Sequence, residues 1–197
     1  MSEIFDPPSK RVVALIGLPG AGKGAVSDIL KEKGFRHVAT GDMVREEAIR
    51  HGVGIDDRYK LHGIANDIQA EGGPEALAKR VIEKIRASVE NVWVVDGIRH
   101  PAQVAELKEK MNALILGITA TREVLIKRIL SRKRTGDPKT PKEASDLIDR
   151  EWGLGATKTP SIQVGKCMLM VDEIIENNGT LHSLKKEISN FCDRIKL

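Results

Sequence analysis

Cysteine and aromatic residues are scarce in this sequence. The two cysteines among 197 residues, Cys167 and Cys192, lack CxxC spacing and a neighbouring histidine cluster, which argues against a disulfide framework and a zinc site. We expect both thiols to be buried in a reducing compartment. The two tryptophans, one tyrosine and three phenylalanines are too scattered to form the stacking platform of a single-strand binder, so nucleic acid is not an expected partner.

Long apolar runs are absent as well. The apolar segments are far shorter than the roughly 20 residues of a membrane span, and residues 1–10 lack the apolar core of a secretory signal. We therefore expect a cytoplasmic protein without a membrane partner. The net charge of +4 suits an anionic ligand but is also compatible with a solvated surface. The hydrophobic content of 41% is enough for one core, and we expect a single domain over residues 1–197.

Short apolar runs alternate with segments of helical period. This order predicts an α/β fold, with a parallel sheet covered by helices on both faces. The expected strands are 12–16, 92–95, 114–118 and 167–171, with a weaker one at 36–39.

Several residues predict where helices begin and end. Gly34 closes a helix that starts near Gly22, and Thr140 and Glu143 have the spacing of a capping box. Thr180 is the expected N-cap of a last helix. The apolar stripe of that helix is expected to pack in the core; it consists of Leu184, Ile188, Phe191 and Ile195.

A glycine-rich segment follows the first expected strand and opens the first helix. Its sequence, Gly17-Leu-Pro-Gly-Ala-Gly-Lys-Gly24, has the setting of a phosphate-binding P-loop. Glycines let the backbone amides point at a polyphosphate, and the helix N-terminus adds positive potential. We expect Lys23 to reach the β- and γ-phosphates of a nucleotide. The expected nucleotide-binding residues are Gly17, Pro19, Gly20, Ala21, Gly22, Lys23, Gly24 and Ala25.

The loop resembles that of the adenylate kinase family, which generally has Thr where this chain has Ala25. The usual P-loop hydroxyl after the lysine is also missing, because Gly24 stands there. The resemblance implies ATP and Mg²⁺ as cofactors, although the motif does not separate ATP from GTP. Without the hydroxyl, Mg²⁺ would be held by phosphate oxygens, water and a carboxylate elsewhere.

A second segment, residues 39–45, resembles the family's STGDMLR motif. The resemblance assigns Thr40, Asp42 and Arg45 to the acceptor monophosphate, with Thr40 near the base and Arg45 at the phosphate. Without the resemblance, Thr40 or Asp42 is an ordinary N-cap and Arg45 a surface cation.

A third segment, residues 96–103, resembles the family's DGFPRxxxQ with one residue fewer. The resemblance implies that Asp96 holds Mg²⁺ through water, that Arg99 binds the acceptor phosphate and that Gln103 contacts the acceptor base. The spacing of Arg99 and Gln103 would allow both to share one helical face. The alternative for Gln103 is a solvated helix residue, and we interpret His100 as an exposed loop residue.

Cations cluster after the expected strand 114–118. Arg128 and Arg132 match the family's RxxxR before its lid, and Arg134 follows in a basic loop. By resemblance these arginines, together with Arg150, neutralise the transferring phosphoryl group. The plainer interpretation is a solvated basic loop. The lid has no zinc-binding cysteines and is expected to be metal-free.

The resemblance covers nearly the whole chain. Residues 137–140, 149–155 and 178–180 resemble most the adenylate-kinase-related and dephospho-CoA-kinase-like group known chiefly from archaea. The resemblance implies a P-loop three-layer fold with a five-stranded parallel sheet, a helical acceptor-binding insertion at about 41–73 and a lid at about 131–141. The expected activity is phosphoryl transfer from ATP to a nucleotide-like small molecule, with a nucleoside monophosphate as first candidate.

Two alternatives stay open. In a dephospho-CoA kinase-like enzyme the acceptor hydroxyl would need a base, for which Asp42 is available. In a nucleotide-dependent switch or assembly ATPase, slow hydrolysis would respond to a macromolecule. Both a monomer and a homodimer are compatible with the sequence.

Overall fold

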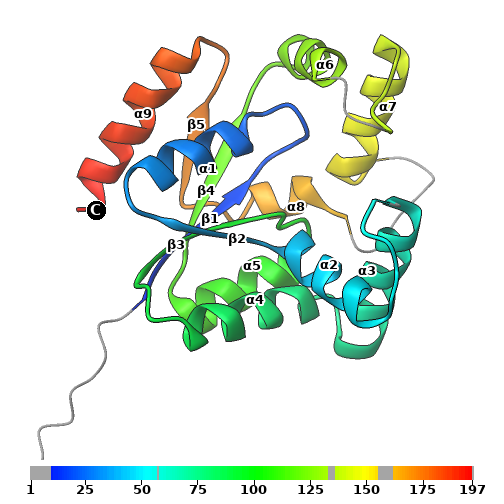
Figure 1. Cartoon of the computed structure of the whole chain (residues 1–197). Helices are drawn as coiled ribbons and strands as arrows, with labels where there is room; N and C mark the ends of the chain where they lie inside the picture. The colour runs from blue at the N-terminus through cyan, green and yellow to red at the C-terminus, as the bar shows by residue number, and fades with distance from the viewer. Residues whose placement is uncertain (1–9, 57, 133–135, 155–161, 197) are drawn as a thin grey trace, which may run out of the picture.

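A computed structural model describes residues 10–56, 58–132, 136–154 and 162–196. Five parallel strands form one sheet in the order β2-β3-β1-β4-β5 (Figure 1). The expected α/β fold class is therefore confirmed, and β1 lies at the centre of the sheet. The strands are β1 (Arg11–Ile16), β2 (Arg36–Ala39), β3 (Val92–Asp96), β4 (Leu114–Thr119) and β5 (Glu173–Glu176).

Helices cover both faces of the sheet. Alternation along β1 explains how one strand serves two cores: Val12 and Ala14 pack with α4, α5 and α8, whereas Val13 and Leu15 pack with α1 and α9. The described helices are α1 (Lys23–Glu32), α2 (Thr40–Arg50), α3 (Arg58–Gly72), α4 (Ala76–Ala87), α5 (Pro101–Met111), α6 (Arg122–Ser131), α7 (Pro141–Trp152), α8 (Val164–Met168) and α9 (Leu181–Arg194).

The fifth strand is not where the apolar run 167–171 predicted it. Cys167 is fully buried in the short helix α8, and the strand is instead β5, Glu173–Glu176. A short apolar run is compatible with a buried helix as well as a strand. Strand β5 pairs with β4 and lies at the edge of the sheet, so it buries Ile175 while Ile174 stays 53% exposed. Because glutamates stand at both ends of β5, its sequence lacks the apolar run from which we predicted the other strands.

Most expected helix ends are confirmed. Thr140 caps α7 by accepting a hydrogen bond from the amide of Glu143 (3.2 Å), but the Glu143 carboxylate accepts from the amide of Lys139 (2.7 Å) and so completes the cap one residue earlier. Thr180 caps α9 in the same way, and Leu184, Ile188 and Phe191 of that helix are buried. Cys167 and Cys192 are both buried free thiols.

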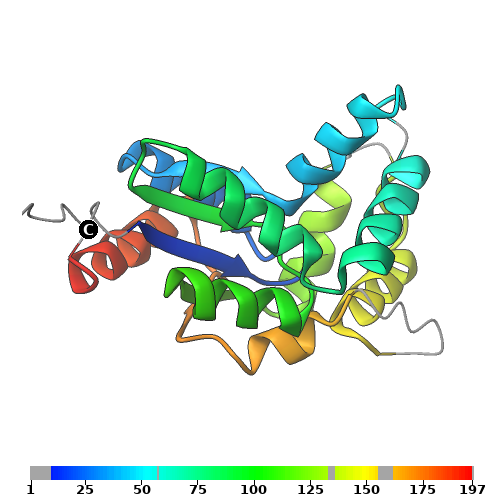
Figure 2. The same cartoon turned by 90° about the horizontal axis from the view of Figure 1, so that it is seen from below.

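Helices α2, α3, α6 and α7 gather at one end of the molecule, beyond the carboxyl ends of the strands. The view in Figure 2 shows the same grouping. The described part of the expected insertion at about 41–73 contains most of α2 and all of α3, whereas the expected lid is described only at 131–132 and 136–141. Every helix among the described residues is too short or too polar to span a lipid bilayer.

Candidate functional site

The glycine-rich loop connects β1 to α1 in a conformation that requires its glycines. Gly20 (φ +85°) and Gly22 (φ +106°) adopt left-handed backbone, where a side chain is strained. A Cβ on Gly22 would lie 2.2 Å from Nδ2 of Asn177, and one on Gly20 would lie 2.9 Å from the Leu125 carbonyl oxygen. The first amides of α1 have no intrahelical acceptor, which makes this turn suitable for an anion.

Lys23 is the first residue of α1, and its side chain folds back into the loop. Its ammonium group donates hydrogen bonds to the carbonyl oxygens of Gly17 (2.7 Å) and Leu18 (3.3 Å). Burial lowers the pKa of Lys23 and Arg99 adds to this, whereas the carboxylates of Asp96 and Glu151 act in the opposite direction. The lysine is thus a partly desolvated cation beside two carboxylates.

The ends of β2 and β3 meet beside this loop. The Asp96 carboxylate at the end of β3 accepts a hydrogen bond from the Gly97 amide (2.6 Å), and the buried Thr40 hydroxyl donates to the Gly97 carbonyl (2.8 Å). Gly97 has φ +85°, and a Cβ there would lie 2.5 Å from the Thr40 hydroxyl oxygen. Thr40 therefore joins the two strand ends, a contact that its position in the motif did not reveal.

Asp42 and Arg45 form an ion pair on the first turns of α2. One Asp42 oxygen accepts from the Ala39 amide (2.8 Å), and the other accepts from the Arg45 guanidinium (2.8 Å). Both side chains remain substantially exposed. Asp42 caps its helix in this arrangement, and the pair leaves Arg45 at the rim of the site.

Arg99 and Gln103 interact, but not as two members of one helical face. Helix α5 begins at Pro101, so Arg99 lies in the preceding turn, and its amide donates to Oε1 of Gln103 (3.0 Å). Gln103 is only 2% exposed, which rules out the solvated alternative. Its buried amide positions the backbone that carries Arg99.

Glu151 is a member of the site that the sequence did not single out. This carboxylate from α7 is 7% exposed and accepts a hydrogen bond from the Arg99 guanidinium at 3.0 Å. It lies near enough to raise the pKa of Lys23. Glu151 lies on the same face of α7 as the buried Ala144 and Ile148, and only the fold identifies what this carboxylate contacts.

His100 is partly buried and not the exposed loop residue we expected. Its Nδ1 accepts a hydrogen bond from the amide of Ala102 (3.1 Å) as the N-cap of α5, and its Nε2 lies 3.2 Å from Nε2 of Gln163. Burial lowers the pKa of His100, and Lys166 adds to this. The neutral imidazole suits a capping role next to Arg99.

Arg128 on α6 contacts backbone carbonyl oxygens of two segments. Its guanidinium donates to the carbonyl oxygens of Asn177 (2.8 Å) and Gly179 (3.4 Å), and reaches that of Gly20 (3.5 Å). It therefore bridges the glycine-rich loop and the segment that follows β5.

Two of the other three expected cations, Arg132 and Arg150, lie in the described part of the chain. Arg132 forms a two-point ion pair with Asp137 (2.7 and 2.8 Å) and is close enough to lower the pKa of Lys23. Arg150 is exposed on α7, one residue from Glu151. Arg134 lies outside the described residues.

Of the two carboxylates that act on Lys23, that of Asp96 is the candidate ligand of a magnesium ion, because that of Glu151 accepts a hydrogen bond from Arg99. Gly24 and Ala25 supply no hydroxyl, and among the described residues no three His, Cys, Asp or Glu side chains form a metal cluster. Mg²⁺ usually takes one or two carboxylates together with substrate phosphates and water. The donor set therefore fits a nucleotide-dependent magnesium ion better than a resident one.

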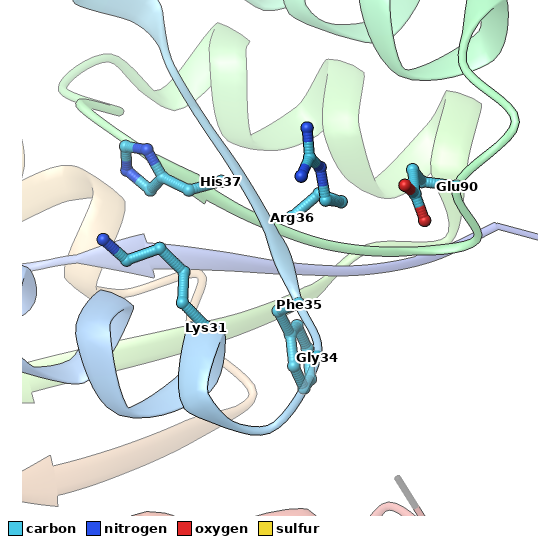
Figure 3. Close-up of a pocket in the computed structure, with 6 residues that line it drawn as sticks. All are labelled: Lys31, Gly34, Phe35, Arg36, His37 and Glu90. Atoms are coloured by element: carbon cyan, nitrogen blue, oxygen red, sulfur yellow. The ribbon is translucent and has the colours of Figure 1, made fainter.

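Two concavities differ in their relation to this site. One of about 230 Å³ lies beside the loop and is lined by Leu18, Leu125, Ile148 and Trp152, among others. A more open one of about 580 Å³ lies where α1 ends and β2 begins, with Lys31, His37 and Glu90 around it (Figure 3). Because it lies at the opposite ends of α1 and β2 from Lys23 and Thr40, it is separate from the candidate site.

Comparisons with known proteins agree with this geometry. Residues 16–145 match the family model described as an AAA domain. The UPF0200 protein of Pyrococcus horikoshii is 30% identical over 93% of this chain and 97% of its own length. A UPF0200/UPF0201 protein of Archaeoglobus fulgidus is 33% identical over 90% of this chain, which corresponds to 54% of that protein.

Solved structures show the same fold at low sequence identity. Shikimate kinase from Bacteroides thetaiotaomicron superposes with a TM-score of 0.64 at 12% identity, covering 95% of this chain and 99% of that one. Shikimate kinase from Acinetobacter baumannii, solved in complex with shikimate, gives a TM-score of 0.58 at 17% identity over 96% and 97% of the two chains.

Proposed function

Because this chain belongs to the AAA domain family and to the UPF0200 proteins, and has a P-loop kinase-like fold, we propose that it is an ATP-dependent phosphotransferase. One observation carries the proposal. The Lys23 ammonium lies within a glycine-rich loop, and the charges of Asp96, Arg99 and Glu151 act on it. Phosphoryl transfer needs positioned charge of this kind more than a covalent nucleophile.

The donor side consists of the loop and the start of α1. The amides of Gly22, Lys23 and Gly24 would bind the donor phosphates, and Lys23 would exchange its loop carbonyl contacts for phosphate oxygens. Asp96 would hold the magnesium ion through water, and that ion supplies charge neutralisation between the phosphates. Arg132 and Arg150 would add positive charge from the lid side.

The acceptor side lies between α2 and α5. Arg99 and Arg45 would bind an acceptor phosphate, and Gln103 and Thr40 would shape the base site. This arrangement supports a nucleoside monophosphate as acceptor. The two arginines belong to different elements, so an anion bound by both would join α2 to the turn before α5.

A hydroxyl acceptor, as in a dephospho-CoA kinase-like reaction, is the second candidate, and Glu151 favours it. A hydroxyl must lose a proton, which a carboxylate can accept, whereas a phosphate acceptor is already ionised. Glu151 is better placed than Asp42, because both Asp42 oxygens are engaged at the start of α2.

An acceptor screen with purified protein tests the proposal. ATP or GTP would be supplied with nucleoside monophosphates, dephospho-CoA or shikimate, and nucleoside diphosphate production would be followed by chromatography. We expect turnover only with an acceptor. Slow hydrolysis that no acceptor stimulates but a macromolecule does would favour a switch, and absence of nucleotide binding would contradict the whole proposal.

A further inference from the structure

Asn177 is a buried polar residue that connects the segment after β5 to the glycine-rich loop. It is 6% exposed, and its Nδ2 donates a hydrogen bond to the carbonyl oxygen of Ala21 at 2.8 Å. The backbone amide of Asn177 donates to the Thr119 carbonyl (2.7 Å), which fixes the Asn177 backbone to the end of β4. The hydrogen bond between Asn177 and Ala21 therefore joins the loop to the segment at the edge of the sheet, although the two residues are 156 positions apart in the sequence.

The contact with Ala21 determines the direction of the next amide. In a planar trans peptide the C=O of one residue and the N–H of the next point in opposite directions. Holding the Ala21 carbonyl toward Asn177 therefore turns the Gly22 N–H away from Asn177, to the opposite side of the loop. Gly22 also has no room for a Cβ on the Asn177 side, where the distance would be 2.2 Å.

Arg128 holds Asn177 in turn. Its guanidinium donates to the Asn177 backbone carbonyl at 2.8 Å and lies 3.4 Å from Oδ1 of the same residue. With Oδ1 facing Arg128, Nδ2 is directed to Ala21, so the arginine selects the orientation of the side-chain amide. The pair therefore contacts the loop at the carbonyl oxygens of Ala21 and Gly20.

We propose that Asn177, oriented by Arg128, is a positioning residue that aims the Gly22 amide at the donor phosphates. The inference rests on the proposed donor site and assigns Arg128 to this pair instead of to the transferring phosphoryl group. The chemistry recognised through it is a di- or triphosphate chain, independent of the base attached to it.

Asn177→Asp is the sharpest variant. It keeps the size and the oxygen that faces Arg128, but it removes the N–H that Ala21 accepts from. We expect the dissociation constants of ATP and of inorganic pyrophosphate to rise together by about tenfold or more, the effect of one lost hydrogen bond. The KM for ATP should rise while the KM for the acceptor stays constant, whereas general loosening of the fold would change both.

Two further variants keep the test decisive. Asn177→Ala removes the donor without adding a charge and should weaken both ligands if the aspartate variant does not fold. Asn178→Ala is the matched control, because the Asn178 side chain accepts from Thr121 and not from the loop, and it should bind ATP as wild type does. Titration calorimetry of each variant, with its thermal midpoint, provides the measurements.

Each outcome has a distinct meaning. Weaker ATP binding with unchanged pyrophosphate binding would overturn the inference, because Asn177 would then be reading the nucleobase. Wild-type affinity for both ligands in Asn177→Asp and Asn177→Ala would overturn it too. If the wild-type protein binds neither ATP nor pyrophosphate, the proposed function itself fails and the inference falls with it.

Discussion

The glycine-rich loop and the surroundings of α7 are held in place by different kinds of interaction. The loop is packed so tightly that a single Cβ on Gly22 would collide with Asn177, and a buried hydrogen bond secures it. Helix α7 buries Ala144 and Ile148 in the same apolar cluster as α6, and the exposed pair of Arg122 and Asp149 adds a polar contact between the two helices. Exposed ion pairs contribute little and are screened by salt. The comparison indicates that buried contacts hold both regions, whereas the exposed pair on the α7 side adds only a small contribution that depends on salt.

Replacing Lys23 by alanine should give the largest effect on the donor side. We expect kcat to fall by about 10²–10³-fold, as when one preorganised donor to developing charge is removed. The thermal midpoint should hardly change, because the ammonium contacts only loop carbonyls. Lys127→Ala, on the exposed face of α6, is the control. Near-normal turnover in a well-folded Lys23 variant would remove the loop from the active site.

Alanine substitutions at two glycines compare a tightly packed position, Gly22, with an open one, Gly52. Gly52 has φ +67°, and a Cβ added there would meet no other atom within 4 Å, so Gly52→Ala should cost only the left-handed strain. That strain is about 1–2 kcal/mol. Gly22→Ala adds the collision with Asn177 and should cost more, while also weakening ATP binding. Urea unfolding measures both. Equal costs would show that the loop is not tightly packed.

Two arginines of the acceptor side should differ in stability but not in function. Arg99→Ala and Arg45→Ala should each raise the acceptor KM and leave the KM for ATP unchanged. Arg99→Ala should also lower the free energy of unfolding by about 1–3 kcal/mol, since buried Glu151 loses its partner. Arg45→Ala should cost below about 1 kcal/mol, because its pair with Asp42 is exposed. An equal rise in the KM for ATP would place either arginine on the donor side.

Asp149→Asn should give the smallest effect. The hydrogen bond from Arg122 lowers the pKa of Asp149 in the folded protein. The pair therefore stabilises the fold at pH values above the usual pKa of an aspartate, and this contribution is lost as the pH falls through the lowered pKa. A slight fall in the thermal midpoint should be the same at pH 6 and 8. It should vanish in 1 M salt, where the screening length is about 3 Å. A large effect independent of salt would contradict the comparison.

The central part of the fold could be predicted because its strands are apolar on both faces. The runs 12–16, 92–95 and 114–118 were correctly assigned, and the weaker run 36–39 was too. β5 could not be found in the same way, because an edge strand with glutamates at both ends carries little apolar signal. The apolar run that includes buried residues of α8 was instead wrongly predicted to be the fifth strand.

The candidate site was predictable where a motif specifies backbone shape and unpredictable where distant segments meet. The glycine spacing of the loop indicated the left-handed turns at Gly20 and Gly22. The partners of Glu151 and Asn177 lie far along the chain, so no local pattern indicates what these two polar residues contact. The roles of all these residues toward substrate, magnesium or the nucleotide stay predictions.

The central position of β1 has a consequence for synthesis on the ribosome. This apolar strand pairs with β3 and β4, which begin at Val92 and Leu114, so neither neighbour exists when β1 emerges. At about 5–20 residues per second, β1 waits several seconds for its first partner. Its two unpaired edges are then a template for association with other chains. Chaperone protection of the nascent chain should therefore matter most before β4 is complete.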